Sequence, residues 1–123
     1  MSQALIEELP KKRHSGKTTL ISLEKEEFRM VTLTAKLTVK AGKEQEFEET
    51  MKKVVPEVRK EAGNRAYTMC KAKDNPRVFM FYEEYVDDDA FKAHRKHLGE
   101  LGVNLAALLD GAPALEFYEK IAS

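Results

Sequence analysis

One stretch of strict alternation limits the possible folds of this chain more than any other feature. In "VTLTAKLTV", from Val31 to Val39, apolar side chains occupy one parity, and threonine and lysine residues occupy the other. Successive side chains of a β-strand point to opposite faces, so the pattern predicts a strand with one apolar face. The apolar parity consists of Val31, Leu33, Ala35, Leu37 and Val39.

A helix is expected after this strand. Apolar residues recur at helical spacing between Lys43 and Ala62, and Pro56 inside the pattern predicts a kink or a restarted turn. Gly63 is a natural residue for the C-terminal cap of this helix. Two strands joined by a turn should follow, then a second helix that starts behind three aspartates, and a last strand. These later elements are predicted at residues 66–72, 77–85, 90–109 and 114–121.

The order strand, helix, strand, strand, helix, strand is the ferredoxin-like βαββαβ arrangement. The predicted fold is therefore α+β, with one four-stranded antiparallel sheet and both helices on one face of it. If the odd-numbered residues of the third strand face the helices, the opposite sheet face would expose Val78, Met80 and Tyr82, which share the other parity. An exposed apolar face implies a partner, and the simplest partner is a second copy, giving a homodimer joined through sheet faces.

Length and charge limit the number of domains and the kinds of partner that this protein can have. The 123 residues suffice for one domain, and the polar stretch at residues 1–27 is predicted to be an N-terminal arm on a domain at residues 28–123. Lys and Arg total 21, and Asp and Glu total 21, so no net charge favours nucleic acid or an anionic membrane. The apolar runs are too short for a membrane span or a signal peptide, and Cys70 has no disulfide partner. We therefore expect a cytoplasmic protein.

The arm contains Gly16, Lys17 and Thr18, the last three residues of a phosphate-binding loop. A working loop also needs a glycine five residues earlier and a buried strand before it, but Lys11 occupies that position and no strand is predicted there. Nucleotide binding is therefore not expected. Residues 18–23 can instead form a short strand that docks on a sheet edge, and a loose tail is the alternative.

The predicted second helix carries two histidines on its apolar side. At about 100° of rotation per residue, His94, His97 and Asn104 fall within one arc that faces the sheet. Glu83 and Tyr85 share the parity of the third strand that can face this helix. A histidine and a carboxylate in an aromatic cavity suit proton abstraction from an activated carbon or a phenol. The candidates are His94 as the catalytic proton acceptor and, as substrate-binding residues, Phe79, Phe81, Glu83, Tyr85, His97, Leu101 and Asn104.

Two other interpretations of these histidines remain open. A buried imidazole can be a structural residue that bonds a backbone carbonyl or a carboxylate, with Glu83 as a satisfied anchor. Alternatively, two histidines three positions apart could hold a metal ion if a third ligand came from the sheet, and Glu83 is the obvious candidate. The metal interpretation has the weaker support, so neither a metal nor a cofactor is predicted.

Three stretches of the sequence resemble the antibiotic biosynthesis monooxygenase family, and together they extend over about residues 30–121. They are "VTLTAKLTVKAGKEQEFEE", "FYEEYVDDDAFKAH" and "LAALLDGAPALEFYE". The resemblance implies a dimeric α/β barrel of two ferredoxin-like subunits, each with a pocket between sheet and helices. Members oxidise aromatic polyketides or quinols with O₂ and without a cofactor or metal. His94 matches the family's histidine after the acidic cluster, and Glu83, Tyr85 and His97 match further family positions.

The resemblance thus implies a cofactor-independent monooxygenase that acts on a small aromatic or quinone-like ligand. It does not extend to the haem-degrading relatives, because the chain lacks Trp and has Ala35 where those relatives have Asn. The first alternative is an isomerase of a small keto compound, with the same histidine as proton shuttle. The second is a binding or dimerisation module without chemistry, because a fold alone does not fix an activity.

Overall fold

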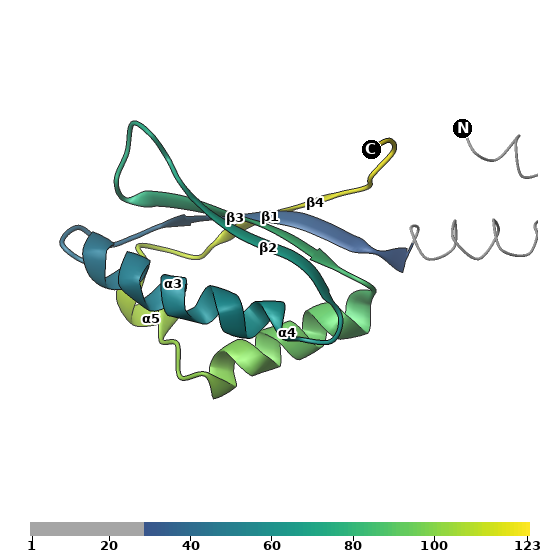
Figure 1. The fold of residues 1–123 in the computed structure, drawn as a ribbon. Helices are drawn as coiled ribbons and strands as arrows, with labels where there is room; N and C mark the ends of the chain where they lie inside the picture. The colour runs from purple at the N-terminus through teal and green to yellow at the C-terminus, as the bar shows by residue number, and fades with distance from the viewer. Residues whose placement is uncertain (1–28) are drawn as a thin grey trace, which may run out of the picture.

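The fold is described from a computed structural model, which defines residues 29–123 (Figure 1). The predicted arm at residues 1–27 lies outside the described residues, so its docking stays a prediction. The described chain forms a strand, a long helix, two strands, a second helix followed by a short helical turn, and a last strand. The elements are β1 (Val31–Thr38), α3 (Glu44–Arg59), β2 (Asn64–Lys71), β3 (Val78–Tyr85), α4 (Asp88–Glu100), α5 (Leu105–Leu108) and β4 (Ala114–Tyr118).

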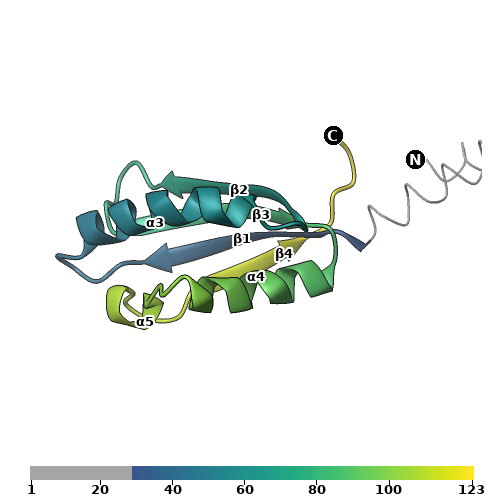
Figure 2. The ribbon, with the colours of Figure 1, turned by 60° about the horizontal axis from the view of Figure 1, so that its bottom comes forward.

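The four strands form one antiparallel sheet in the order β2-β3-β1-β4. Figure 1 shows α3, α4 and α5 on one face of this sheet, and Figure 2 shows the two long helices running across that face. This is the predicted α+β ferredoxin-like fold, which is therefore confirmed, with α5 as a short addition. Among the described residues, no helix combines the length and the apolar character that crossing a membrane requires.

The core lies between the sheet and α3. The apolar parity predicted for β1 is buried apart from the half-buried Val31, and Leu33 and Leu37 are at most 5% exposed. Phe47 of α3 is fully buried, and its ring centroid lies 4.8 Å from that of Phe79 on β3. Burial of a large apolar side chain contributes roughly 1.5–3 kcal/mol, so these contacts hold α3 against the sheet. They also fix the parity of β3 that faces the helices, which comprises Phe79, Phe81, Glu83 and Tyr85.

The second predicted helix is in fact two helices. α4 ends at Glu100, and Gly102 adopts a φ of 77°, a left-handed conformation that interrupts the helix. Asn104 then caps α5 by accepting a hydrogen bond from the backbone N–H of Ala107 at 3.3 Å. The prediction of one helix over residues 90–109 was therefore wrong. The apolar spacing misled the prediction because it continues past Gly102, where the backbone leaves the helical conformation.

One detail of α3 also differs from expectation. Lys60, not Gly63, is the C-cap residue of the helix. A Cβ atom at Gly63 would lie 2.3 Å from the Cβ of Ala90, so glycine is needed here because the α3–β2 segment approaches α4 closely. Pro56 lies inside α3, and the helix continues past it to Arg59 without a restart.

The sheet face away from the helices is less apolar than predicted. Val78, Met80 and Tyr82 lie on it as expected, but each is half-buried, and Glu84 on the same face is only 9% exposed. The segment after β4 turns over this side of the sheet (Figure 1), where Nζ of Lys120 lies 3.0 Å from a carboxylate oxygen of Glu84. The face is therefore mixed, with a partly exposed ion pair beside its apolar residues.

Candidate functional site

The centre of the candidate site is the imidazole of His94, which α4 directs onto the sheet. Asp87 caps the start of this helix by accepting a hydrogen bond from the backbone N–H of Ala90 at 2.8 Å. His94 follows about two turns later, and only 3% of it is exposed. Its ring centroid lies 5.1 Å from that of Tyr85 and 5.3 Å from that of Tyr67. An ionisable ring is thus held among aromatic side chains.

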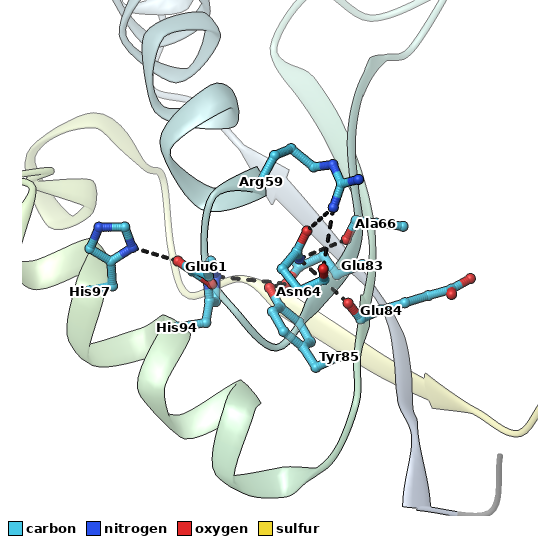
Figure 3. A network of polar contacts seen from close by, with 9 residues as sticks. All are labelled: Arg59, Glu61, Asn64, Ala66, Glu83, Glu84, Tyr85, His94 and His97. Carbon is cyan, nitrogen blue, oxygen red and sulfur yellow. Dashed lines mark hydrogen bonds and ion pairs between the residues drawn. The ribbon is translucent and has the colours of Figure 1, made fainter. Parts of the chain in front are cut away.

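A carboxylate from another element meets this histidine. Glu61 lies in the segment between α3 and β2, and both of its oxygens are 3.2 Å from Nδ1 of His94. One of them is also 2.6 Å from Nδ1 of His97, one turn further along α4 (Figure 3). An ionised carboxylate only accepts hydrogen bonds, so each imidazole presents its Nδ1–H group to Glu61. In the neutral ring, Nε2 of His94 is then the nitrogen without a proton.

A second carboxyl group lies on the other side of His94. Glu83 on β3 is 5% exposed, and its Oε1 atom lies 3.8 Å from Nε2 of His94, beyond direct hydrogen-bond distance. The hydroxyl of Tyr85 donates a hydrogen bond of 2.7 Å to the same oxygen. His94 therefore sits between two carboxyl groups, and its unprotonated nitrogen faces the pair formed by Glu83 and Tyr85.

Burial moves the protonation equilibria of these groups. It raises the pKa of Glu83 to about 7, while the hydrogen bond from Tyr85 opposes this shift and the negative charge of Glu61 adds to it. Burial also lowers the pKa of His94, against the opposing effect of Glu61. The pKa of the Tyr85 hydroxyl is raised by burial and by the charge of Glu83. Near neutral pH the site thus holds a neutral imidazole beside a carboxyl group close to its own midpoint.

Several of the predicted site residues form one contact network. His94, Glu83 and Tyr85 contact one another, and His97 joins them through Glu61 (Figure 3). In the part of the chain that the structure describes, no group of three or more His, Cys, Asp or Glu residues is arranged to hold a metal ion. The arrangement can accept a proton at one nitrogen and stabilise the resulting positive charge through a carboxylate at the other.

Two of the predicted aromatic residues belong to the core. Phe79 is 1% exposed and packs against Phe47 of α3. Phe81 is 2% exposed and packs against Tyr67, with 5.3 Å between ring centroids, and Tyr67 in turn packs against His94. Phe79 therefore supports the site from a distance, and Phe81 supports it through one intervening ring.

The two remaining predicted residues lie beyond the end of α4. Leu101 packs at the margin of the core. Asn104 is exposed and its side chain caps α5. The prediction that Asn104 shares the arc of His94 was wrong, because a rotation of about 100° per residue applies only while the helix continues, and α4 ends at Glu100.

Sequence reasoning missed three neighbours of His94, namely Glu61, Tyr67 and Phe91, and the first two come from other elements than α4. A signal for Glu61 existed, because a negative charge just after the C-terminus of a helix is unfavourable and calls for a nearby cation or hydrogen-bond donor. A signal for Tyr67 existed as well, since the hairpin register places it directly opposite Glu83. Neither signal identifies His94 as the contacting residue, because each contact joins residues more than 25 positions apart in the chain.

An aromatic side chain of β4 links the surface to the surroundings of His94. Two surface hollows of the described residues lie elsewhere, one near Cys70 and Met80 and the other near Arg29. Phe117, on the helix-facing side of β4, is 57% exposed and packs edge-on against Phe91 at 5.8 Å between ring centroids. The ring of Phe91 is nearly parallel to that of His94, at 6.4 Å. Packed aromatic rings therefore connect the exposed Phe117 to the buried imidazole.

Comparisons with known proteins agree with this architecture. The sequence profile described as antibiotic biosynthesis monooxygenase matches residues 30–99, more than half of the chain. A conserved protein from Methanosarcina mazei has a solved structure with a TM-score of 0.69 at 27% identity, covering 80% of this chain and 99% of that one. A protein from Caulobacter crescentus, provisionally described as an antibiotic biosynthesis monooxygenase, gives 0.67 at 26% identity, covering 76% of this chain and 91% of its own.

A third solved structure, from Pseudomonas aeruginosa, has a TM-score of 0.69 at 24% identity over 76% of this chain and 96% of its own, which shows the shared fold alone. No curated protein sequence matches the chain significantly. The profile match and the βαββαβ sheet point to the same family as the sequence stretches singled out above. The chain belongs to the antibiotic biosynthesis monooxygenase family.

Proposed function

We propose that the protein is a cofactor-independent monooxygenase that oxidises a small aromatic or quinol-type substrate with O₂, and that His94 accepts the substrate's proton. The observation that carries this proposal is the orientation of His94. Its Nδ1 atom faces Glu61, and its basic Nε2 atom faces Glu83. Family membership supports the reaction class. An imidazole that is neutral near pH 7 is a suitable general base for a phenol or an activated C–H group.

Removal of this proton prepares the substrate for oxygen. A phenol or an activated methylene group becomes an electron-rich anion, which can transfer an electron to O₂. The proton goes to Nε2 of His94, and the imidazolium that forms is stabilised by the carboxylate of Glu61 at Nδ1. The hydroxyl of Tyr85 and the protonated form of Glu83 are donors that can stabilise the substrate anion.

The oxidation needs no external reductant. When a CH₂ group becomes a carbonyl, one oxygen atom enters the product, and the other leaves as water together with the two hydrogens. The substrate therefore supplies all the electrons. The rings of Tyr67, Tyr85 and Phe91 around His94 keep bulk water away from the anion, which lowers the chance that it is simply reprotonated.

The aromatic side chains beside β4 support a flat ring system as the substrate. Phe117 offers an exposed aromatic surface, and Phe91 links it to His94. Aromatic rings gain about 0.5–1.5 kcal/mol from offset or edge-on contacts beyond the burial of their area. A planar phenol, quinol or polyketide that takes over the contact with Phe91 would bring an acidic O–H or C–H group towards Nε2 of His94.

An oxygen-electrode assay with a panel of quinols and tricyclic polyketides tests the proposal. We expect O₂ uptake that EDTA does not change, and a loss of turnover in folded His94→Ala on the order of 10²–10⁴-fold. Lys96→Ala, on the exposed side of α4, is the matched control and should retain the wild-type rate. Wild-type turnover in folded His94→Ala would rule out the general base, and loss of activity in EDTA would restore the metal interpretation.

One observation favours isomerisation of a small keto compound as a second candidate. Glu83 has its pKa raised to about 7 and faces the basic nitrogen of His94, so one group can donate a proton while the other accepts one. Such a reaction exchanges substrate hydrogen with solvent and consumes no oxygen. Incubation of keto compounds in D₂O under nitrogen separates the candidates, because deuterium uptake without O₂ supports the isomerase.

A further inference from the structure

We infer that Glu61 is a positioning residue of this site: its carboxylate holds His94 in the Nδ1–H tautomer and makes the basicity of His94 depend on the charge of His97. The inference rests on the proposed function and deepens it, because it states how the same site responds to pH. Its first test measures the histidines directly and needs no substrate.

The geometry of one carboxylate with two imidazoles carries this inference. Glu61 is 3.2 Å from Nδ1 of His94 through each of its oxygens, and one oxygen lies 2.6 Å from Nδ1 of His97. Only 13% of the Glu61 side chain is exposed, so these bonds are poorly screened by water. Hydrogen bonds to an ionised group are roughly twice as strong as neutral ones, which favours the tautomer that donates from Nδ1.

The segment that carries Glu61 is itself held in place. Its backbone N–H donates to the carbonyl of Val58 at 2.9 Å, and its carbonyl accepts from Asn64 at 3.1 Å. The side chain of Asn64 accepts a hydrogen bond from Arg59 (Figure 3), and the carbonyl of Gly63 accepts one from Val86 at 2.9 Å. Because hydrogen bonds fix this segment, the carboxylate of Glu61 can orient the imidazole of His94 on another element. A carboxylate on a mobile segment would instead adjust to the position of the imidazole.

The charged and titratable neighbours of His94 divide into two sets. Burial is the largest influence on the pKa of His94 and lowers it; the negative charge of Glu61 and its hydrogen bond raise it, and the positive charges of His97 and Arg95 lower it. The groups packed against His94 are Glu61 from the α3–β2 segment, Tyr67 from β2, Glu83 and Tyr85 from β3, and His97 with Arg95 from α4 itself.

His97 is the partly exposed member of the network formed by His94, Glu61 and His97. Its side chain is 29% exposed, whereas that of His94 is 3% exposed, so His97 exchanges protons with water more readily. A proton on His97 offsets part of the negative charge of Glu61 and makes His94 a weaker base. The basicity of His94 therefore depends on the charge of this neighbour as well as on its own burial.

Nitrogen-15 NMR of the imidazole rings in the full-length protein tests the inference. We expect the Nδ1–H tautomer for His94 in the wild type, a growing Nε2–H form in Glu61→Gln, and a fall in the pKa of His94 of about one unit or more. Glu57→Gln, one turn earlier and exposed, is the matched control and should change neither property. A folded Glu61→Gln variant with the wild-type tautomer and pKa of His94 would overturn the inference.

A second variant keeps the test decisive if Glu61→Gln does not fold. His97→Gln retains a donor towards Glu61 but carries no charge, so the pKa of His94 should rise and the acid limb of turnover, which follows protonation of this base, should move to higher pH. An unchanged pKa of His94 in this variant would overturn the coupling. If the NMR shifts appear as expected but no substrate is oxidised, the positioning role stands and the proposed monooxygenase activity fails.

Discussion

At the scale of single residues, the site is built from groups that are costly to bury. Glu83 and His94 are each at most 5% exposed. Burial raises the pKa of Glu83 and lowers that of His94, so it favours the neutral form of both side chains. An apolar pair of similar size would pack at this position without such a penalty. The cost is offset only in part by Glu61 and Tyr85, which supply hydrogen bonds.

Glu83→Gln should reveal how much the burial of an ionised Glu83 lowers the free energy of unfolding. The folded pKa of Glu83 is about 7 against an ordinary value of 4.5, so the native state binds the extra proton between those values and wild-type stability falls as pH rises through that window. The shift is worth on the order of 3 kcal/mol. We expect Glu83→Gln to gain stability relative to the wild type between pH 5 and pH 8, as measured by urea unfolding at each pH.

The lowered pKa of His94 acts in the opposite direction, since the unfolded state then binds more protons and stability rises with pH through its own titration. That contribution is common to the wild type and Glu83→Gln to first approximation, so it largely cancels in the difference. A stability difference that stays constant across the pH range would contradict the assignment of a raised pKa to Glu83.

At the scale of elements, the break between α4 and α5 decides which residues can reach the sheet. Gly102 has a φ of 77° in this break, whereas Gly99, three residues earlier, lies in the last turn of α4. The break releases Asn104 to cap α5 and leaves His94 and His97 as the polar residues of α4 that meet Glu61.

The two glycines provide a matched pair of variants. Gly102→Ala should destabilise the protein by about 1 kcal/mol, because a side chain at positive φ is strained. Gly99→Ala should be neutral or stabilising by up to about 1 kcal/mol, because alanine favours a helix and no atom lies within 4 Å of the added Cβ. Chemical denaturation measures both values. Equal effects of the two substitutions would argue that residues 100–104 are not held in the observed turn.

At the scale of the whole molecule, the described residues leave apolar side chains exposed or half-buried on both faces of the sheet. Met80 and Tyr82 are half-buried on the face away from the helices. Phe117 and Tyr118 on β4 are 57% and 51% exposed, and they point to opposite faces of this edge strand. Exposed apolar patches of this kind are typical of interaction surfaces, so they favour the homodimer expected from the sequence.

We expect the protein to be a homodimer joined through sheet faces at micromolar concentration, as measured by light scattering. Met80→Glu places a charge at the centre of the proposed interface and should shift the protein to the monomer, while Lys53→Glu on the exposed side of α3 should leave the dimer intact. A monomeric wild type would contradict the dimer. A dimeric Met80→Glu protein would place the interface elsewhere, with the β4 edge as the next candidate.

The fold was predictable because local signals agree with one another. The alternation in β1, the helical spacing in α3 and the aspartates before α4 each identify an element, and only one familiar topology fits their order. Gly63 and Gly102 show where such signals mislead. Gly63 looked like a helix cap but is required by its approach to Ala90, and Gly102 interrupts a helix whose apolar spacing continues beyond it.

The sequence by itself determined that His94 lies on the sheet-facing side of its helix, and that Glu83 would lie beneath it if the parity of Glu83 in β3 faced the helices. The packing of Phe79 and Phe81 against α3 and β2 decided that parity. Only the tertiary structure decided what orients the histidine. Glu61 reaches His94 and His97 across 33 and 36 positions of the chain, by the close approach of the α3–β2 segment to α4. Periodicity specifies the face on which a side chain lies, whereas the packing of separate elements specifies the atom that it meets.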